Sequence, residues 1–369
     1  MLPSLPLPDA DRPASSVSSA RIPALDGVRG WAILAVMFHN SGHLQRIFAN
    51  GWMGVDLFFV LSGFLITGIL VDTKQSQHYF KNFYVRRCLR IWPLYYSLLL
   101  FMAVAVTFLP SPSRALLEKS SPWWAYPLFL QNFLIAIPTL GVGPLGVTWS
   151  LAIEEQFYLL WALVVRYCSL PQIRRIAIAV ICLSPPLRWF LSFHNVNLYT
   201  NLFCRLDGLM AGAALALVVR GEDFVPSRYL KTAWILLFMA TPLAFALASS
   251  HAEWVLYSAS AAVSVLFVYV VLFSRQRLLQ RIMTNRLIVY TGTISYGLYL
   301  LHKLPFDVAK ATDRDGKPLL LLLLSIVASY ALAALSWNLL EKPFLRLKRF
   351  FPYEPSYENG AGRELPRAS

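Results

Sequence analysis

An arginine and a histidine ten residues apart are the first side chains in this sequence whose types and spacing could do chemistry. Arg29 and His39 belong to one apolar run. Because a helix rises 1.5 Å per residue, the two lie about 15 Å apart along it and cannot hydrogen-bond to each other. A neutral imidazole can take a proton from a hydroxyl group, whereas a guanidinium binds phosphate. We therefore expect His39 to act as a general base deep in a cavity, with Arg29 near the mouth through which a phosphorylated donor arrives.

Other ionisable side chains also interrupt the apolar runs. Each costs several kcal/mol in a bilayer unless it faces a polar cavity, so each is a candidate site residue. They are Asp26, Asp56, Glu154, Glu155, Arg188, Arg205, Asp207 and His302. Plainer explanations exist: a histidine can pack and bond to a backbone carbonyl, and Arg205 and Asp207 could form a structural ion pair.

Glu154 follows a stretch rich in glycine and opens a predicted helix. Its carboxylate could orient the histidine or bind the hydroxyl groups of an acceptor. Tyr158, one turn further on, shares its helix face. A helix N-terminus also tolerates negative charge without any function.

Three arginines, Arg86, Arg87 and Arg90, stand immediately before the third apolar run, and the last two share a helix face. Guanidinium groups arranged in this way could bind the phosphates of a donor. They could equally anchor the helix at anionic lipid. Charge alone leaves both interpretations open.

The composition identifies the elements that must position these residues. The chain is 57% hydrophobic and 14% charged, with a mean hydropathy of +0.54, which indicates a membrane protein. The net charge of +14 does not predict nucleic-acid binding, because the basic residues cluster in the short connections between apolar runs. The four cysteines have no CxxC spacing, which predicts reduced packing residues, with neither a disulfide framework nor a metal site.

The fold expected is all-α, a polytopic bundle of about ten transmembrane helices with both termini in the cytoplasm. The predicted spans are 24–45, 52–71, 91–110, 149–167, 175–192, 202–219, 232–249, 254–273, 287–303 and 319–340. With the N-terminus inside, every inner connection is basic. Residues 123–137 are also apolar, but an eleventh span there would place the later basic connections outside. We interpret this segment as re-entrant or interfacial.

The ends of the chain have a different composition. Residues 1–21 are rich in proline and serine and lead into the first span without a cleavable signal, so we expect that helix to be retained. We predict a disordered cytoplasmic tail at 1–21, a membrane domain at 22–346 and a cytoplasmic tail at 347–369, disordered from residue 352.

Several motifs, taken in order, resemble those of the acyltransferase 3 family of membrane enzymes. They are LDGVRG at 25–30 with FH at 38–39, GVDLFFVLSGFLI at 54–66, FYVRRCLRIWP at 83–93, WSLAIEEQFY at 149–158, RLDG at 205–208, the serine and aromatic residues of 295–302, and EKPF at 341–344. The resemblance covers residues 22 to 346. One departure concerns the first helix, where the family usually places ten residues between the arginine and the histidine and this chain has nine. His43 on the same helix is therefore an alternative to His39.

The resemblance implies transfer of a short acyl group, acetyl above all, from cytoplasmic acyl-coenzyme A to a hydroxyl group. Arg86, Arg87 and Arg90 would bind the donor, and His39, Glu154 and Arg29 would be catalytic. Asp56, Tyr158, Arg205, Asp207 and His302 would line the acceptor side. The acceptor would be a surface polysaccharide, a lipid-linked glycan, peptidoglycan or a macrolide-type metabolite. No bound cofactor is implied, and transfer would be completed within the membrane domain of a bacterial inner membrane.

Direct transfer and an acylated side chain both remain open, as does the oligomeric state. Two other classes of function compete with this interpretation. A transporter would use the intramembrane charges as a substrate pathway and would show uptake without acyl chemistry. A membrane scaffold would tolerate replacement of His39 without loss of function.

Overall fold

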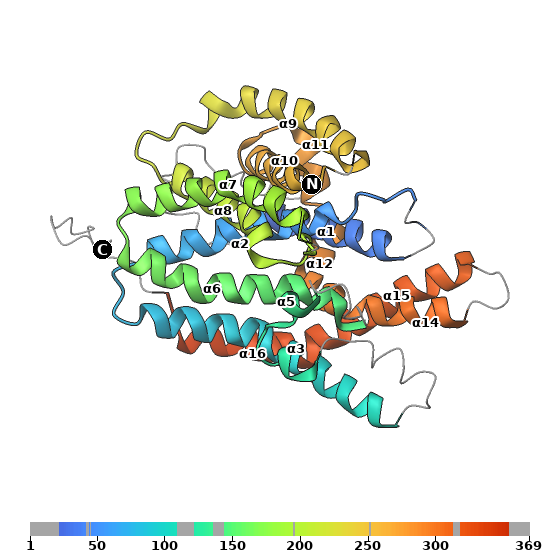
Figure 1. The fold of residues 1–369 in the computed structure, drawn as a ribbon. Helices are drawn as coiled ribbons and strands as arrows, with labels where there is room; N and C mark the ends of the chain where they lie inside the picture. Colours follow the sequence, from blue (N-terminus) through green and yellow to red (C-terminus); the bar gives the residue numbers. More distant parts are fainter. Residues whose placement is uncertain are drawn as a thin grey trace, which may run out of the picture.

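In the computed structural model the described residues are 22–41, 44, 46–108, 122–135, 144–194, 196–250, 252–312 and 318–353. They form helices and contain no strand, which confirms the predicted all-α class. The predicted tail at 1–21, the segment 354–369 and His43 lie outside this part of the chain. Most of the long helices run roughly side by side (Figure 1).

The first half of the chain contains α1 (Pro23–Asn40), α2 (Met53–Asp72), α3 (Tyr79–Phe108), η2 (Trp123–Ala125), α5 (Gln131–Ile135), η3 (Pro144–Thr148), α6 (Trp149–Tyr167) and α7 (Leu170–Ser192). The second half contains α8 (Leu202–Val219), α9 (Pro226–Ser249), α10 (Glu253–Phe273), α11 (Arg277–Met283), α12 (Arg286–Thr293), α13 (Ser295–Leu301), α14 (Lys303–Thr312), α15 (Pro318–Ser336), the π-helical turn η4 (Trp337–Glu341), α16 (Lys342–Arg346) and η5 (Leu347–Phe350).

Seven helices among the described residues are long and apolar enough to cross a bilayer, which confirms a polytopic membrane protein. They are α2, α3, α7, α8, α9, α10 and the continuous stretch from α15 to η5. The other three predicted spans correspond to α1, α6 and the pair α12 and α13. The number ten and the cytoplasmic placement of both termini stay predictions.

Several predicted span edges differ from the helix ends by five or six residues, among them the end of the first span, since α1 ends at Asn40. Two differences are larger. Helix α3 begins at Tyr79, twelve residues before the predicted span, so the three arginines lie inside a helix and not ahead of one. The polar start of α3 is held by buried aromatic residues, since Phe83 is fully buried and Tyr79 nearly so. The predicted span 287–303 is interrupted at Ile294, where α12 ends and α13 begins.

The apolar segment after residue 122 forms only short helical turns among the described residues, η2 and α5. Its two polar side chains are fully buried and bonded. Gln131 donates to the Tyr95 hydroxyl (3.2 Å) and the Thr148 carbonyl (3.0 Å), and Asn132 exchanges bonds with Gln156. The segment therefore packs against α3 and α6 without crossing the bilayer as a helix.

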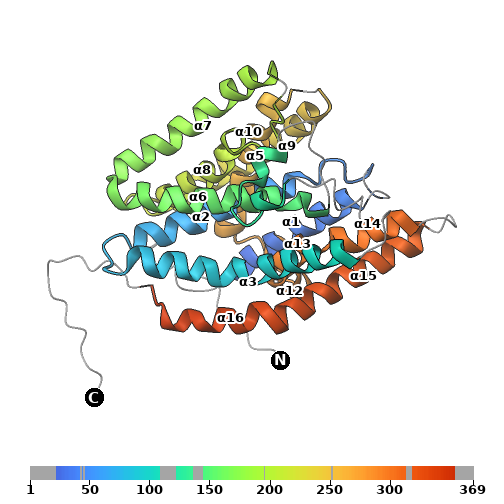
Figure 2. The same cartoon turned by 60° about the horizontal axis from the view of Figure 1, so that its bottom comes forward.

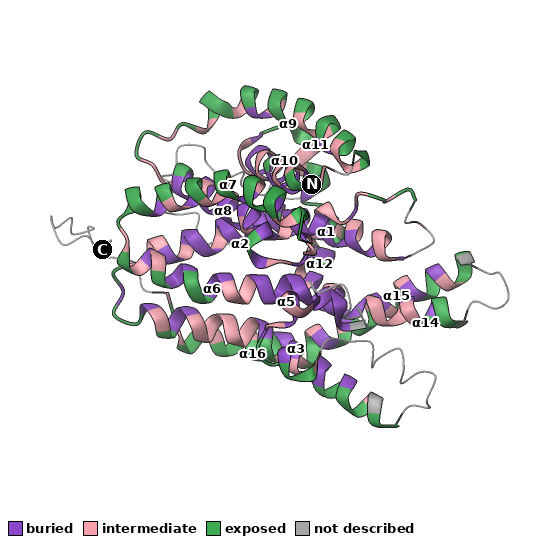
Figure 3. Cartoon of the chain, viewed as in Figure 1, coloured by how far each residue is buried: buried purple, intermediate pink, exposed green. Residues whose placement is uncertain are grey.

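Glycines allow the central helices to approach closely. A Cβ atom added to Gly63 of α2 would overlap the Leu209 carbonyl of α8, and one added to Gly212 of α8 would overlap the Val60 carbonyl of α2. Small residues at such crossings are typical of membrane helix packing. Figure 3 shows the result, with α2 and α8 largely buried and α9 exposed along much of its length.

The connections predicted to be cytoplasmic are tied to one another. Arg220 at the end of α8 binds Asp72 at the end of α2 through two bonds of 2.8 and 3.0 Å. Lys74 donates to the Cys168 carbonyl beyond α6, and Arg166 donates to the Lys74 carbonyl. The ends of α2, α6 and α8 therefore belong to one end of the bundle, as an alternating topology requires.

Candidate functional site

A cavity of about 430 Å³ lies at the opposite end of these helices. It is lined by Val36, His39, Asn40, Trp52, Val55, Ile135, Gly146, Val147, Trp149, Asn197, Tyr199, Thr200, Ala248, Glu253, Leu256, Tyr257, Tyr299 and Lys303. We call it the outer cavity, because loop charge predicts that these helix ends face outward. Five aromatic rings and several polar side chains share its wall.

His39 lies at the last turn of α1 and is half-buried in the wall of the outer cavity. Its Nδ1 atom is 3.2 Å from the Phe48 carbonyl oxygen. A carbonyl can only accept a hydrogen bond, so Nδ1 carries a proton, and Nε2 is the nitrogen that holds the lone pair when the ring is neutral. The chain after α1 folds back onto the end of this helix, and the ring centroids of Phe38 and Phe48 are 4.9 Å apart. The imidazole is thus oriented as a base.

His302 is in a different situation, because it is fully buried and absent from the cavity wall. Its Nδ1 atom donates to the carbonyls of Leu298 (3.0 Å) and Tyr299 (2.9 Å). Its Nε2 atom accepts from the Asn40 amide at 3.2 Å. Both ring nitrogens are used, so in this structure His302 joins α13 to the outer end of α1 and holds the residue next to His39.

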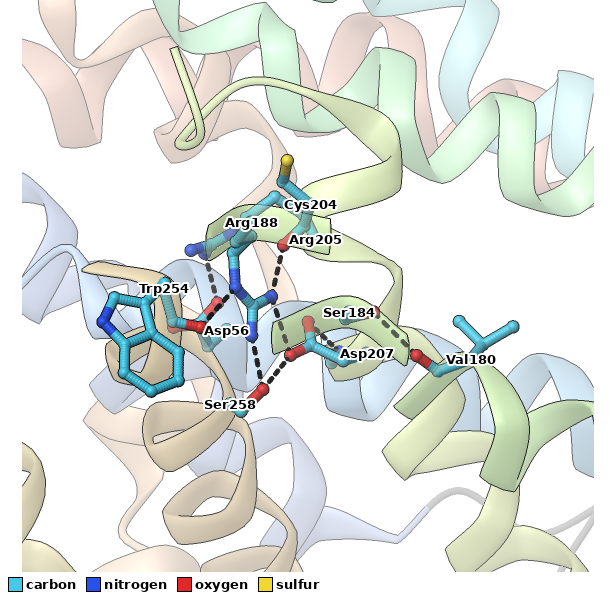
Figure 4. Close-up of polar contacts among 10 residues, drawn as sticks. Asp56, Val180, Ser184, Arg188, Cys204, Arg205, Asp207, Trp254 and Ser258 are labelled. Atoms are coloured by element: carbon cyan, nitrogen blue, oxygen red, sulfur yellow. Dashed lines mark hydrogen bonds and ion pairs between the residues drawn. The ribbon is translucent and has the colours of Figure 1, made fainter. Parts of the chain in front are cut away.

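Arg205 and Asp207 do not pair with each other, which was the structural alternative to a site role, because each has another partner (Figure 4). Arg205 forms an ion pair with Asp56 of α2, and both are nearly inaccessible. The guanidinium lies 4.1 Å from the ring centroid of Tyr257 and 5.2 Å from that of Tyr199. Arg205 and Asp56 are therefore not exposed in the outer cavity but lie directly behind its aromatic wall.

Asp207 binds Arg188 of α7 at 2.9 Å and accepts from Ser258 of α10 at 2.5 Å. The nitrogen of Arg188 that binds Asp207 also donates to the Cys204 carbonyl (2.6 Å). The other two nitrogens donate to the Trp254 carbonyl (2.9 Å) and to Ser258 (Figure 4). This network fastens α7, α8 and α10 together. Every nitrogen of the buried Arg188 guanidinium is hydrogen-bonded, which offsets the cost of removing its charge from water.

Glu154 and Tyr158 lie one turn apart on α6, as predicted from their spacing, and are bonded at 3.2 Å. The Tyr158 hydroxyl is also 2.6 Å from Ser62 of α2. Arg29 and Arg87 are close enough for their charges to act on the Glu154 carboxylate. Arg29 itself pairs with Asp26 at 3.3 Å. The structure therefore brings Arg29, Arg87, Glu154 and Tyr158 together, away from the outer cavity.

The three arginines of α3 are not equivalent. Arg86 donates to the carbonyls of Lys348 (3.0 Å) and Phe351 (2.9 Å). Arg87 and Arg90 form no hydrogen bond or ion pair with the residues that the structure describes, although both are partly buried. The Arg87 guanidinium lies 5.9 Å from the ring centroid of Phe83 and within electrostatic reach of Tyr353, and Arg90 lies within electrostatic reach of Glu341. Unpartnered guanidinium groups are suited to an anionic ligand.

Sequence reasoning did not single out several residues of the cavity. Asn40, Glu253 and Lys303 are polar lining residues without a distinctive motif. Tyr299 lines the cavity and its hydroxyl is 2.5 Å from that of Ser150, one turn before Glu154. The signal for this last pair was present, since both residues belong to the motifs quoted above.

Comparison with known proteins gives a consistent result. A family profile described as an acyltransferase domain matches residues 22–338. The peptidoglycan O-acetyltransferase OatA of Listeria monocytogenes is 28% identical over 367 residues, which cover 92% of this chain and 58% of OatA. A Bacillus subtilis protein named "Putative peptidoglycan O-acetyltransferase YrhL" is 29% identical over 355 residues, covering 87% of this chain and 54% of that protein.

A Staphylococcus aureus protein named "Putative O-acetyltransferase SACOL0978" is 26% identical over 364 residues, covering 91% of this chain and 59% of the relative. The chain thus spans between half and three-fifths of the length of these relatives. No solved structure matches it.

Proposed function

Because this chain belongs to the acyltransferase 3 family, we propose that it is an O-acyltransferase of the bacterial cytoplasmic membrane. It moves a short acyl group, most simply acetyl, from cytoplasmic acyl-coenzyme A to a hydroxyl group of a carbohydrate or related acceptor. The observation that carries the proposal is the position of His39 in the wall of a cavity large enough for a substrate, with Nδ1 bonded to the Phe48 carbonyl so that Nε2 is the nitrogen able to act as a base.

The donor would bind at the inner end of the bundle. Coenzyme A carries three phosphate groups, and Arg87 and Arg90 supply guanidinium groups that form no ion pair with the described residues. Arg29 of α1 lies within electrostatic reach of Arg90. Because a helix rises 1.5 Å per residue, Arg29 is about 15 Å from His39 along α1. A donor with a long flexible arm can bridge this separation, with its phosphates at the arginines and its thioester near the histidine.

The acceptor would enter the outer cavity. The aromatic side chains Trp52, Trp149 and Tyr257 offer flat apolar faces, while Asn197 and Glu253 offer groups that bond to hydroxyls. This combination suits a sugar ring, which has apolar faces and a polar edge. Two relatives have names that specify peptidoglycan. Peptidoglycan is one of the four acceptor candidates, together with surface polysaccharide, lipid-linked glycan and macrolide-type metabolites.

In the proposed reaction His39 Nε2 takes the proton of the acceptor hydroxyl as its oxygen attacks the thioester carbonyl. A carbon–oxygen bond forms and the carbon–sulfur bond breaks. The imidazolium then returns the proton to the departing thiolate, so the histidine is unchanged after each turnover. The bond from Nδ1–H to the Phe48 carbonyl keeps the ring in the correct tautomer throughout.

The test uses membranes that contain the wild-type protein, His39→Gln or His194→Gln. His194 is a matched control, because its Nδ1 also bonds to a backbone carbonyl (Phe190, 3.0 Å) but it is exposed at the end of α7. Radiolabelled acetyl-coenzyme A is supplied with an extract of host glycans and metabolites, and label is followed into alkali-labile esters. We expect His39→Gln to lower transfer by about 10²- to 10⁴-fold and His194→Gln to leave it unchanged.

Equal transfer by His39→Gln and wild type would overturn the role of the histidine. No transfer by wild type with acetyl or longer acyl donors, together with uptake of a polar solute, would overturn the proposed function in favour of a transporter.

A further inference from the structure

The segment that follows the last span packs against the start of α3. Helix α16 and the first part of α3 lie side by side in both Figures 1 and 2. Asn82 of α3 donates to the Pro352 carbonyl at 2.7 Å. Arg86, one turn later, donates to the carbonyls of Lys348 and Phe351 and lies 4.2 Å from the ring centroid of Tyr353. We call residues 347–353 the C-terminal strap.

Arg86 is therefore engaged by the strap. Two of its bonds go to main-chain oxygens and its flat face stacks on an aromatic ring, an arrangement that Lys could not reproduce. This leaves Arg86 poorly placed to act as a phosphate ligand, in contrast to Arg87 and Arg90 on the same helix. Its position instead fixes where the strap lies relative to those two.

The strap brings a further cation to the arginines. Lys348 is partly buried, and Arg29, Arg86, Arg87 and Arg90 all lie within electrostatic reach of its ammonium group. Lys348 forms no hydrogen bond through its side chain and no ion pair among the described residues. Gathering like charges in a partly buried place is unfavourable unless an anion joins them.

Three polar atoms beside this group have no hydrogen bond in the described part of the chain. They are the Tyr353 hydroxyl and the Nε atoms of Arg86 and Arg87. The Tyr353 hydroxyl lies close enough to the Arg87 guanidinium for the two groups to interact. The strap therefore contributes a cation and a hydroxyl donor to the same place where α3 contributes two free guanidinium groups.

We propose that the C-terminal strap forms one wall of the donor site, with Lys348 as a phosphate ligand beside Arg87 and Arg90 and with Arg86 as the residue that anchors the strap. The ligand class is a polyphosphate-bearing acyl donor, so this inference rests on the proposed function for the identity of the donor. It assigns Arg86 a positioning role in place of the phosphate-binding role predicted from the sequence.

The test measures equilibrium binding of radiolabelled acetyl-coenzyme A to the purified full chain in detergent, without any acceptor. The variants are Lys348→Gln, Lys348→Arg, Arg86→Gln and Arg349→Gln. Arg349 is the matched control, since it is the adjacent cation of the strap but is exposed and stacks on Phe350 at 4.7 Å. We expect Lys348→Gln and Arg86→Gln to weaken binding about tenfold, Lys348→Arg to retain most of it and Arg349→Gln to retain all of it.

A second measurement separates a phosphate ligand from a structural residue. Amine-reactive labelling followed by mass spectrometry should show that acetyl-coenzyme A protects Lys348 and does not protect exposed Lys342. If wild type binds acetyl-coenzyme A but Lys348→Gln binds it equally well, the inference is overturned and the proposed function stands. If wild type binds no acyl-coenzyme A, both are overturned.

Discussion

The arginines behind the outer cavity and those at the inner end of the bundle differ in what surrounds them. Arg188 and Arg205 each form a buried ion pair, with Asp207 and Asp56 respectively. Arg87 and Arg90 are partly accessible and form no ion pair with any residue that the structure describes. The charges of Arg188 and Arg205 are neutralised by carboxylates of the protein, whereas no carboxylate among the described residues lies at ion-pair distance from Arg87 or Arg90.

This difference separates two reasons for placing a charge in a membrane protein. A buried arginine whose nitrogens are all bonded, such as Arg188, holds helices in register and has no capacity left for a ligand. An arginine with free donors keeps that capacity at some cost in stability. Both kinds stand in or directly beside apolar runs, so their partners are what distinguish a structural charge from a binding one.

The largest effect is expected at Arg188. In Arg188→Met the Asp207 carboxylate is left buried without its cation, which costs about 3–5 kcal/mol, so we expect little folded protein and no activity. The double variant Arg188→Met with Asp207→Leu removes both charges and should recover much of the folded yield. Fluorescence-detected size exclusion measures both. Normal folding of the single variant would show that the outer network is not structural.

The second effect concerns Arg87 and Arg90. Replacing either by Gln removes a charged donor to phosphate, so we expect the KM for acetyl-coenzyme A to rise about 10- to 100-fold while the KM for the acceptor is unchanged. Thermal stability should not fall, because no ion pair is lost. Steady-state kinetics and a melting curve on the same sample test this. A stability loss like that of Arg188→Met would erase the distinction between the two groups.

A smaller effect is expected at Tyr158, which holds the Glu154 carboxylate near the inner arginines. In Tyr158→Phe the carboxylate keeps Ser62 but loses one of its two hydroxyl partners, so it competes more readily with the donor for Arg87. The KM for acetyl-coenzyme A should rise roughly three- to fivefold, the value of one hydrogen bond. Tyr84→Phe is the control, because its hydroxyl also joins α3 to α6, through the Leu159 carbonyl (3.0 Å), but is far more exposed. Equal effects from both variants would argue for simple packing.

The sequence predicted some elements closely and missed others for physical reasons. The bounds of α6 and α8 agree with the predicted spans 149–167 and 202–219, because a change from apolar to polar composition coincides there with the helix ends. Hydropathy reports where the bilayer lies and not where a helix begins, so the start of α3 was missed by twelve residues. The interruption at Ile294 coincides with the polar stretch Thr291-Gly292-Thr293 and Ser295, which the predicted span 287–303 passed through as part of one helix.

The candidate site was predictable in its list of residues but not in their partners. Spacing along one helix predicted that Tyr158 shares a face with Glu154, and the two are bonded. The bond from Asn40 to His302 joins residues 262 positions apart, and no local pattern indicates it. The same holds for Arg86, whose partners lie 262 and 265 positions further on. Long-range partners come from tertiary packing, which composition does not encode.

The central claim is that the donor enters at the inner end of the bundle and the acceptor at the outer end. The most direct test is to determine from which side of the membrane acetyl-coenzyme A supports transfer. Sealed vesicles are prepared in both orientations from membranes with wild type and with His39→Gln, and the impermeant donor is added outside. We predict acetyl ester formation with wild type only in inside-out vesicles, and in neither orientation with His39→Gln. Equal transfer by wild type in right-side-out vesicles would contradict the account.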